Sequence, residues 1–300
     1  MFEHTPVLED EIIKHLRLHR GATIVDATLG CGGHAARILE KITPGGLLIG
    51  IDHDDEAILN AKAKLKPFNA GSYKIIKANF RDIDVVLRRI NIDKVDSVLF
   101  DLGVSSLQLE SPTRGFGIKV NGPLDMRMDN ASQLHAFWVI NKYPRQRLED
   151  IIRNYGEERY ARKIARYITD ERVKSTISTT SQLAGIIERA VGYRYKRLKI
   201  HPATRTFQAI RIEVNDELNA LRDALGKLPK ILNNGARVCV ISFHSLEDRI
   251  VKILFREYSK KQIALLITKK PITASHMEIL KNPRARSAKL RVAEFKGEEK

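Results

Sequence analysis

The sequence predicts an α/β protein with a Rossmann-like, mostly parallel sheet into which a long helical segment is inserted. Short apolar runs alternate with amphipathic helical segments through the first hundred residues, and each run ends in a polar or glycine residue. The alternation stops after Asp101 and resumes near residue 214. These observations predict a discontinuous core of residues 1–106 and 214–300, with an inserted helical domain over residues 107–213.

The first half of the core reads as repeated strand-helix units. Apolar runs predict strands over residues 22–28, 47–52, 74–78 and 97–102. Between them, apolar residues at three- and four-residue spacing predict helices over 35–41, 54–66 and 83–90. Ligands bind beyond the carboxyl ends of the strands in such sheets, so we expect the functional residues there.

The inserted segment carries helical spacing, many Arg and Tyr residues, and no pattern typical of a buried strand. After it, the sequence predicts a helix over 214–228, a strand over 236–242 and a helix over 246–258. Two further strands, over 264–269 and 289–294, are expected to close the sheet as a hairpin-like edge.

Charge and composition narrow the class of partner. The chain has 52 Lys and Arg against 36 Asp and Glu, a formal net charge of +16, which favours a polyanionic partner. We expect a cytoplasmic protein that does not contact membranes, because no apolar run is long enough to span one and the first residues do not resemble a signal peptide. The two cysteines, Cys31 and Cys239, are too few for a disulfide framework or a zinc site.

The first predicted strand ends in Asp26 and runs into a glycine cluster, Gly30-Cys31-Gly32-Gly33-His34, that opens a helix. Glycine allows close backbone approach to a ligand, and Asp52, at the end of the next strand, can accept hydrogen bonds from a ribose diol. The same spacing also fits a dinucleotide fingerprint, so an NAD-dependent oxidoreductase and a purely structural turn remain alternatives. A carboxylate at Asp26 suits a cationic sulfonium better than a pyrophosphate.

The ends of the later strands supply further candidates. Asn79 and Phe80 follow the third strand and can offer an amide and an aromatic face to an adenine, or can be a turn and a core residue. Asp101 ends the fourth strand, where a methyl acceptor would meet a donor; the alternative is a capping acid. The Asn/Asp-Pro-Pro-aromatic sequence of many amino-methyltransferases is replaced here by Asp-Leu-Gly-Val-Ser-Ser.

Two basic segments are candidates for phosphate contact, although solvated surface is the alternative for each. One combines cations with an interleaved aromatic; its candidate RNA-binding residues are Arg194, Lys196, Arg197, Lys199, His201 and Arg205. The other contains Arg284, Arg286, Lys289 and Arg291. The inserted domain is, by hypothesis, a substrate-recognition module.

Seven blocks, in the right order and spread over nearly the whole chain, resemble the bacterial small-subunit ribosomal RNA cytosine-N4-methyltransferase family known as RsmH or MraW. They are residues 4–8 (HTPVL), the 26–34 loop, 101–106 (DLGVSS), 122–129 (GPLDMRMD), 155–158 (YGEE), 201–209 (HPATRTFQA) and 241–249 (ISFHSLEDR). One departure is Gly117, where the family usually has serine.

This resemblance implies a class I (Rossmann-like) S-adenosylmethionine methyltransferase sheet. It further implies that S-adenosyl-L-methionine donates a methyl group to the N4 amine of a cytosine in the decoding region of 16S ribosomal RNA. The partner would be that RNA or the small ribosomal subunit. The donor contacts that it implies are Gly32, Gly33, His34, Asp52, Phe80, Asp101 and Gln108; Asp26 joins them from the loop itself.

Methyl transfer from a sulfonium needs alignment and a proton acceptor, and no metal. Asp101, Asp125 and His244 are the candidate catalytic residues, with Asp129 a further acid in the same block as Asp125. His244 directly follows an apolar strand, where a structural hydrogen bond is the alternative. A non-catalytic RNA-binding assembly factor also stays open at this point, and the sequence does not specify an oligomeric state.

Overall fold

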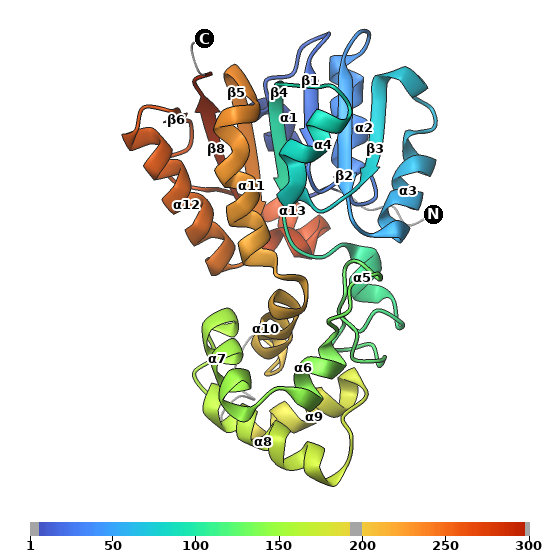
Figure 1. Ribbon diagram of the computed structural model, residues 1–300, viewed down its shortest axis with the longest axis vertical. Helices are drawn as coiled ribbons and strands as arrows, with labels where there is room; N and C mark the ends of the chain where they lie inside the picture. Colours follow the sequence, from blue (N-terminus) through green and yellow to red (C-terminus); the bar gives the residue numbers. More distant parts are fainter. Residues whose placement is uncertain (1–5, 193–199, 298–300) are drawn as a thin grey trace. The chain divides into compact units, whose positions relative to one another are not determined.

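The computed structural model describes residues 6–192 and 200–297. It divides into two compact units, which Figure 1 shows as ribbons coloured along the chain. Unit 1 combines Met1–Gly103 with Leu218–Lys300, and unit 2 is Val104–Glu217. The sequence-based prediction places the boundaries of the inserted domain after residues 106 and 213.

Unit 1 contains one eight-stranded sheet, which confirms the predicted Rossmann-like class of fold (Figure 1). Five strands are parallel, in the order β3, β2, β1, β4, β5. Strand β8 then pairs antiparallel with β5, and the short strands β6 and β7 both pair antiparallel with β8. The strands are β1 (Thr23–Asp26), β2 (Leu47–Asp52), β3 (Tyr73–Lys77), β4 (Val95–Asp101), β5 (Leu232–Ser242), β6 (Ala264–Leu266), β7 (Ile272–Thr273) and β8 (Lys289–Phe295).

Both faces of this sheet are covered, because alternate side chains of its central strands are buried on opposite sides. Ile24 and Leu99 pack in one apolar cluster with residues of α1 (Glu9–His15), α2 (Gly33–Ile42) and α3 (Asp55–Leu65). In Figure 1, α4 (Ile83–Arg89) and α11 (Glu217–Ile231) cross the opposite face. Helix α12 (Ser245–Lys260) joins α11 there through a Tyr258 hydroxyl that donates to the Leu225 carbonyl at 2.8 Å. Helix α13 (His276–Lys281) precedes β8.

Unit 2 is helical in its described part, apart from an isolated bridge between Pro123 and Thr179. Its core is formed by buried aliphatic side chains at helical spacing, such as Ile164, Ala165 and Ile168. Its helices are α5 (Ser106–Glu110), α6 (Ala136–Lys142), α7 (Arg145–Gly156), α8 (Ala161–Lys174), α9 (Thr180–Val191) and α10 (Thr204–Asn215).

The irregular segment between α5 and α6 is held in place by polar contacts rather than by regular structure. The buried Arg114 guanidinium donates to the carbonyls of Arg127 and Met128, each at 3.0 Å. The Asn215 side chain accepts from the Met128 amide at 2.7 Å and donates to the Met126 carbonyl at 2.8 Å. The GPLDMRMD block therefore folds as a fixed loop that α10 helps to anchor.

Several element boundaries differ from the sequence prediction. The helix predicted over 214–228 is α11, which begins three residues later, because α10 ends at Asn215 and Asp216 adopts a left-handed conformation with φ of 51° before α11 begins. Strand β5 starts at Leu232, four residues before the predicted 236, and β6 stops at Leu266 rather than at residue 269. Helix α1 and the two-residue strand β7 are not predicted, because each is too short to show a clear period.

No helix among the described residues is long and apolar enough to cross a membrane.

Candidate active site

Three carboxylates stand at one edge of the sheet, because each is the last residue of a parallel strand. Asp26 ends β1, Asp52 ends β2 and Asp101 ends β4. The register brings the strand ends together: Asp26 lies opposite Gly50 of β2 and Leu99 of β4. The carboxyl edge predicted from the sequence is therefore where these acids gather.

The glycine loop bends between β1 and α2 and leaves the start of α2 open. Gly30 and Gly32 have φ of 52° and 78°, a region that side chains rarely adopt. A Cβ added at Gly33 would lie 2.7 Å from Cγ of Pro6, so this position also requires glycine for packing. No described side chain caps the first turn of α2. Its backbone amides therefore remain available to a ligand.

A triad, which we define as the buried Asp26 and His34 with the partly buried Asp101, forms the centre of this edge. The His34 Nε2 lies 3.6 Å from the Asp101 Oδ2, beyond ordinary hydrogen-bond distance. Asp26 accepts from the Thr28 amide through Oδ1 at 3.2 Å. Among the described residues, Asp26 Oδ2, Asp101 Oδ1 and both ring nitrogens of His34 are buried without a hydrogen-bond partner. Native structures rarely leave such atoms unsatisfied, so the triad has unused capacity for a polar ligand.

The triad has unusual proton affinities. Burial, opposed by the nearby His34 and by the Thr28 amide, raises the pKa of Asp26 to about 7. For His34, burial acts to lower the pKa, but its interactions with Asp101 and then with Asp26 outweigh burial and raise it. A cationic ligand beside these groups would favour the ionised form of Asp26.

Hydrogen bonds orient the carboxylate of Asp52 and fix the backbone of Asp101. Asp52 accepts from the Gly30 amide at 2.8 Å and from the Asp54 amide at 2.9 Å, and burial raises its pKa. The Asp101 amide donates to the Thr28 hydroxyl at 2.6 Å, which ties β4 to the turn after β1. Sequence reasoning did not single out Thr28, since a threonine after a strand carries no distinct signal.

Asn79 and Phe80 begin a short 3-10 turn after β3. The Asn79 side chain accepts from the Arg81 amide at 3.0 Å, as expected of a turn residue. The Phe80 ring packs edge-on against the buried Phe100 at 5.8 Å between centres. Phe80 itself is half-buried, so part of its ring stays accessible.

His244 lies at the carboxyl end of β5 and is the N-cap of α12. Its Nδ1 accepts from the Glu247 amide at 3.4 Å, and the Glu247 carboxylate accepts from the His244 amide at 3.2 Å. The two residues thus form a capping box. The Nε2 of His244 is buried 3.3 Å from Glu247 Oε1 without a hydrogen bond. His244 therefore has the structural hydrogen bond that was the alternative to a catalytic role, and its Nε2 has no hydrogen bond to a described residue.

The candidates in unit 2 have their own local partners. Gln108 is buried and completes the capping box of α5, in which its side chain accepts from the Ser105 amide at 3.0 Å. Asp125 is bound on both oxygens by the Arg127 guanidinium, at 2.9 and 2.7 Å. Burial acts to raise the pKa of Asp125, but the bonds from Arg127 outweigh it and lower that pKa. An acid so held is a poor proton acceptor.

Most of the first basic segment lies outside the described residues, namely Arg194, Lys196, Arg197 and Lys199. His201 pairs with Glu188 at 3.0 Å, and Arg205 donates to the Glu157 carbonyl at 3.1 Å. In the second segment, Arg291 is buried and bound to Asp248, so the expectation of a phosphate contact there is wrong for this residue. Arg291 lies between buried apolar residues in β8, so a charged residue in a basic segment can lie in the interior of the protein.

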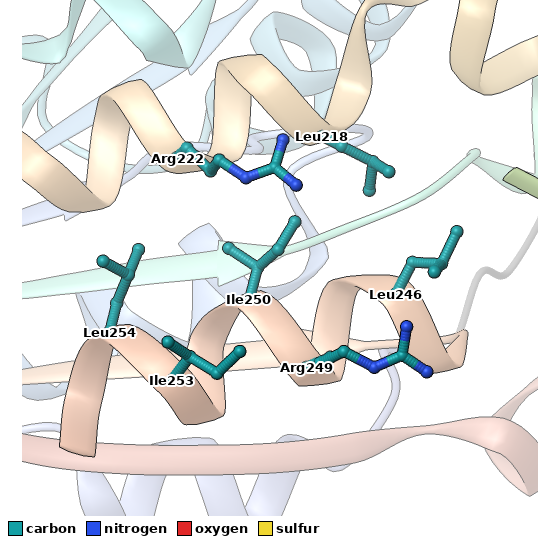
Figure 2. Close-up of a pocket in the computed structure, with 7 residues that line it drawn as sticks. All are labelled: Leu218, Arg222, Leu246, Arg249, Ile250, Ile253 and Leu254. Atoms are coloured by element: carbon teal, nitrogen blue, oxygen red, sulfur yellow. The ribbon is translucent and has the colours of Figure 1, made fainter. Parts of the chain in front are cut away.

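A separate hollow of about 270 Å³ lies between α11 and α12, and Figure 2 shows its lining. Ile250 and Leu254 of α12 point toward α11, and Ile253, Arg222 and Arg249 are also among the lining residues (Figure 2). None of the three strand-end carboxylates lines it. This hollow is therefore separate from the strand-end carboxylates.

Comparison with known proteins gives one consistent family. The sequence profile described as the MraW methylase family matches residues 1–296. The chain is 49% identical over 311 residues to the ribosomal RNA small subunit methyltransferase H of Caldicellulosiruptor saccharolyticus. The alignment covers 98% of this chain and 99% of that protein. It is 48% identical over 293 residues to the protein of the same name from Persephonella marina, again with 98% and 99% coverage.

Proposed function

The chain belongs to the MraW methylase family, and from this premise we propose that it transfers a methyl group from S-adenosyl-L-methionine to 16S ribosomal RNA of the small subunit. The acceptor in this proposal is the N4 amine of a cytosine in the decoding region. The relatives are named as small-subunit ribosomal RNA methyltransferases, which supports the substrate class. We place the reaction in the cytoplasm, with its ribosomal substrate.

The observation that carries the proposal is the group of unpartnered buried polar atoms in the triad of Asp26, His34 and Asp101. Unpartnered atoms of two carboxylates and a histidine, buried at a strand edge, need a ligand that brings positive charge or donors. A sulfonium with an amino group meets that need, whereas a pyrophosphate would add negative charge beside Asp26. The residues present therefore fit the methyl donor.

Each residue of the donor site has a proposed role. When bound, S-adenosyl-L-methionine supplies a methyl group activated by a positively charged sulfur. Asp52, oriented by the Gly30 and Asp54 amides, accepts hydrogen bonds from the ribose hydroxyls through its remaining lone pairs. Asp26 faces the cationic end, and the accessible part of Phe80 lies against the adenine. Gly32 and Gly33 permit close backbone approach, while His34 and Gln108 complete the set.

Asp101 is our candidate for the acceptor side. Its Oδ1 is buried and unpartnered, so it can accept a hydrogen from the cytosine amine and help to localise the amine lone pair. The His34 Nε2 lies 3.6 Å from the other oxygen, close enough to interact with its charge. Asp125 is bound by Arg127, and in this proposal it acts by stabilising its loop. His244 contributes through Nε2, the ring nitrogen that does not take part in capping.

We further propose that the segment containing Arg194, Lys196, Arg197, Lys199, His201 and Arg205 contacts RNA backbone. Five of the six carry a permanent positive charge, and guanidinium groups bind phosphates bidentately. The target cytosine must be unstacked to reach the donor, so the surrounding strand needs to be held.

The test is methyl transfer to small ribosomal subunits that lack the modification, followed by nucleoside analysis. We expect N4-methylcytosine with the wild-type protein and at least about a hundredfold slower formation with Asp101→Asn, which removes a proton acceptor without changing size. Asp93→Asn is the matched control, because Asp93 is exposed in the same unit and precedes the amino end of β4, away from the carboxyl ends of the strands. It should retain wild-type activity.

Three results would contradict parts of the proposal. Methylation of a different nucleoside would support S-adenosyl-L-methionine as the donor but would contradict cytosine as the acceptor. Equal activity of Asp101→Asn and wild type would remove Asp101 from the acceptor site. No transfer despite tight donor and RNA binding would indicate a non-catalytic binding protein.

A further inference from the structure

The beginning of α8 presents a group of cations that no step above uses. Arg159, just before the helix, and Arg162, Lys163 and Arg166 in its first two turns are all exposed. We call these four residues the α8 cationic face. The stretch from Arg159 to Tyr167 contains no acidic residue. The face therefore concentrates positive charge on one short surface of unit 2.

The four side chains have no ion pair or hydrogen bond with another described residue, which sets them apart from their neighbours. Arg153 pairs with Glu149, Arg189 with Glu171 and Arg147 with Glu213. Solvated surface cations in this unit thus commonly have an acid beside them. The α8 cationic face lacks that compensation among the described residues.

Helix electrostatics argue against a stabilising role for the face. The N-terminal turn of a helix carries partial positive charge and favours Asp or Glu. The first turn of α8 has no acid and instead carries Arg162 and Lys163, although the buried Glu158 before the helix accepts from the Tyr160 amide at 2.9 Å. Like charges at Arg162 and Arg166, four residues apart, also repel each other. These cations therefore do not stabilise the helix, which favours a role in binding a negatively charged partner.

Aromatic rings lie beneath these cations. The Arg159 guanidinium lies 4.8 Å from the centre of the Tyr160 ring. The Tyr167 ring has the Lys163 ammonium at 5.7 Å and the Arg166 guanidinium at 5.4 Å. Both tyrosines are half-buried. Ring contacts of this kind hold the long cationic side chains near the surface in a limited set of directions.

We propose that the α8 cationic face binds the sugar-phosphate backbone of a ribosomal RNA strand, at a site additional to residues 194–205. The proposal rests on the proposed function, since it assigns this RNA a second contact. A strand of phosphates matches four adjacent uncompensated cations, and the partly accessible rings can stack against unpaired bases. An anionic membrane fits less well, because the four surface residues include no apolar side chain to insert.

The experiment compares two double variants of the full chain. R162Q/R166Q removes two cations of the face, and R88Q/R89Q removes two exposed cations from the last turn of α4 in unit 1. Affinity for unmodified small subunits, and for a single-stranded ribosomal RNA fragment, is measured over a range of salt concentrations. Each lost phosphate contact should lower the slope of log affinity against log salt by about 0.7.

We expect R162Q/R166Q to bind both RNA probes at least about tenfold more weakly at low salt, with a slope smaller by about 1.4. R88Q/R89Q should match wild type. Thermal stability of R162Q/R166Q should equal or exceed that of wild type, because a cation leaves the first turn of the helix and the repulsion between residues 162 and 166 is removed. Donor binding should not change.

A wild-type slope and affinity for R162Q/R166Q would overturn the inference. So would weaker binding to whole subunits with unchanged binding to the RNA fragment, since that result indicates a ribosomal protein as the partner. Failure of the proposed function is separate: it would appear as absence of methyl transfer by the wild-type protein in the same preparation.

Discussion

Replacing Asp26 with asparagine should strengthen the fold and weaken donor binding. The Asp26 side chain is buried, has one oxygen without a partner and titrates near pH 7 instead of near 3.8. Asparagine keeps the size and the oxygen that accepts from the Thr28 amide. The substitution therefore isolates the effect of the charge.

The sign and size follow from linkage. Because the folded protein holds a proton on Asp26 at pH values where the unfolded chain has lost it, stability is highest below the unfolded pKa and falls as pH rises to the folded pKa. A rise from 3.8 to about 7 corresponds to an upper bound of about 4 kcal/mol. The pKa values of Asp52 and His34 are shifted as well, and their charges interact with that of Asp26, so we expect about half of this, or about 2 kcal/mol.

The assay is thermal unfolding without donor at two pH values. At pH 8, Asp26→Asn should melt about 4–8 °C above wild type. At pH 4.5 the gain should shrink to about a quarter, because little of the difference in protonation has developed there. Asp93→Asn, which changes an exposed acid, should show neither effect.

Donor binding gives the complementary readout. Bound positive charge should lower the pKa of Asp26, so wild type should release a proton on binding S-adenosyl-L-methionine at pH 7. Calorimetry in two buffers of different ionisation enthalpy measures this release. Asp26→Asn should release less and bind at least about tenfold more weakly, or about 1.4 kcal/mol. An equal gain in melting temperature at both pH values, or unchanged proton release, would refute the reasoning.

Three further predictions concern single sites. Gly33→Ala should weaken donor binding at least about tenfold in a calorimetric titration, since its Cβ would meet Pro6 at 2.7 Å; normal binding would show that Pro6 moves away freely. Arg114→Met should lower the free energy of unfolding by about 2–3 kcal/mol in a denaturant titration, because two carbonyls lose a buried charged donor. His244→Asn should keep the α12 cap and the melting temperature while His244→Ala loses about 1 kcal/mol; if His244→Asn also keeps full methyl transfer, the residue serves capping alone.

The parallel half of the sheet was predictable because its strands are short, apolar and bounded by polar residues. The acids at their carboxyl ends were predictable for the same reason, and Asp26, Asp52 and Asp101 do share one edge. The local pattern could not give the boundary between α10 and α11 to the residue, because it depends on one left-handed residue, Asp216, inside a continuous helical period.

Side-chain partners were the part that the sequence could not supply. Nothing near Asp125 in the pattern shows that Arg127 folds back onto both of its oxygens, and nothing near Arg291 shows that a charged residue of β8 is buried against Asp248. Contact between His34 and Asp101 joins residues 67 positions apart in the chain. Such pairings depend on tertiary geometry, whereas periodicity reports only local structure.

The position of β8 has a consequence for how the chain folds during synthesis. Strand β8 pairs with β5, β6 and β7, yet it is the last of the eight strands to leave the ribosome. Until residues 289–295 emerge, β6 and β7 lack their partner and β5 presents an unpaired edge. Long-range pairing of this kind is slow, and an open edge invites association with other chains. Nascent protein that stalls before β8 should therefore be a preferred client of chaperones.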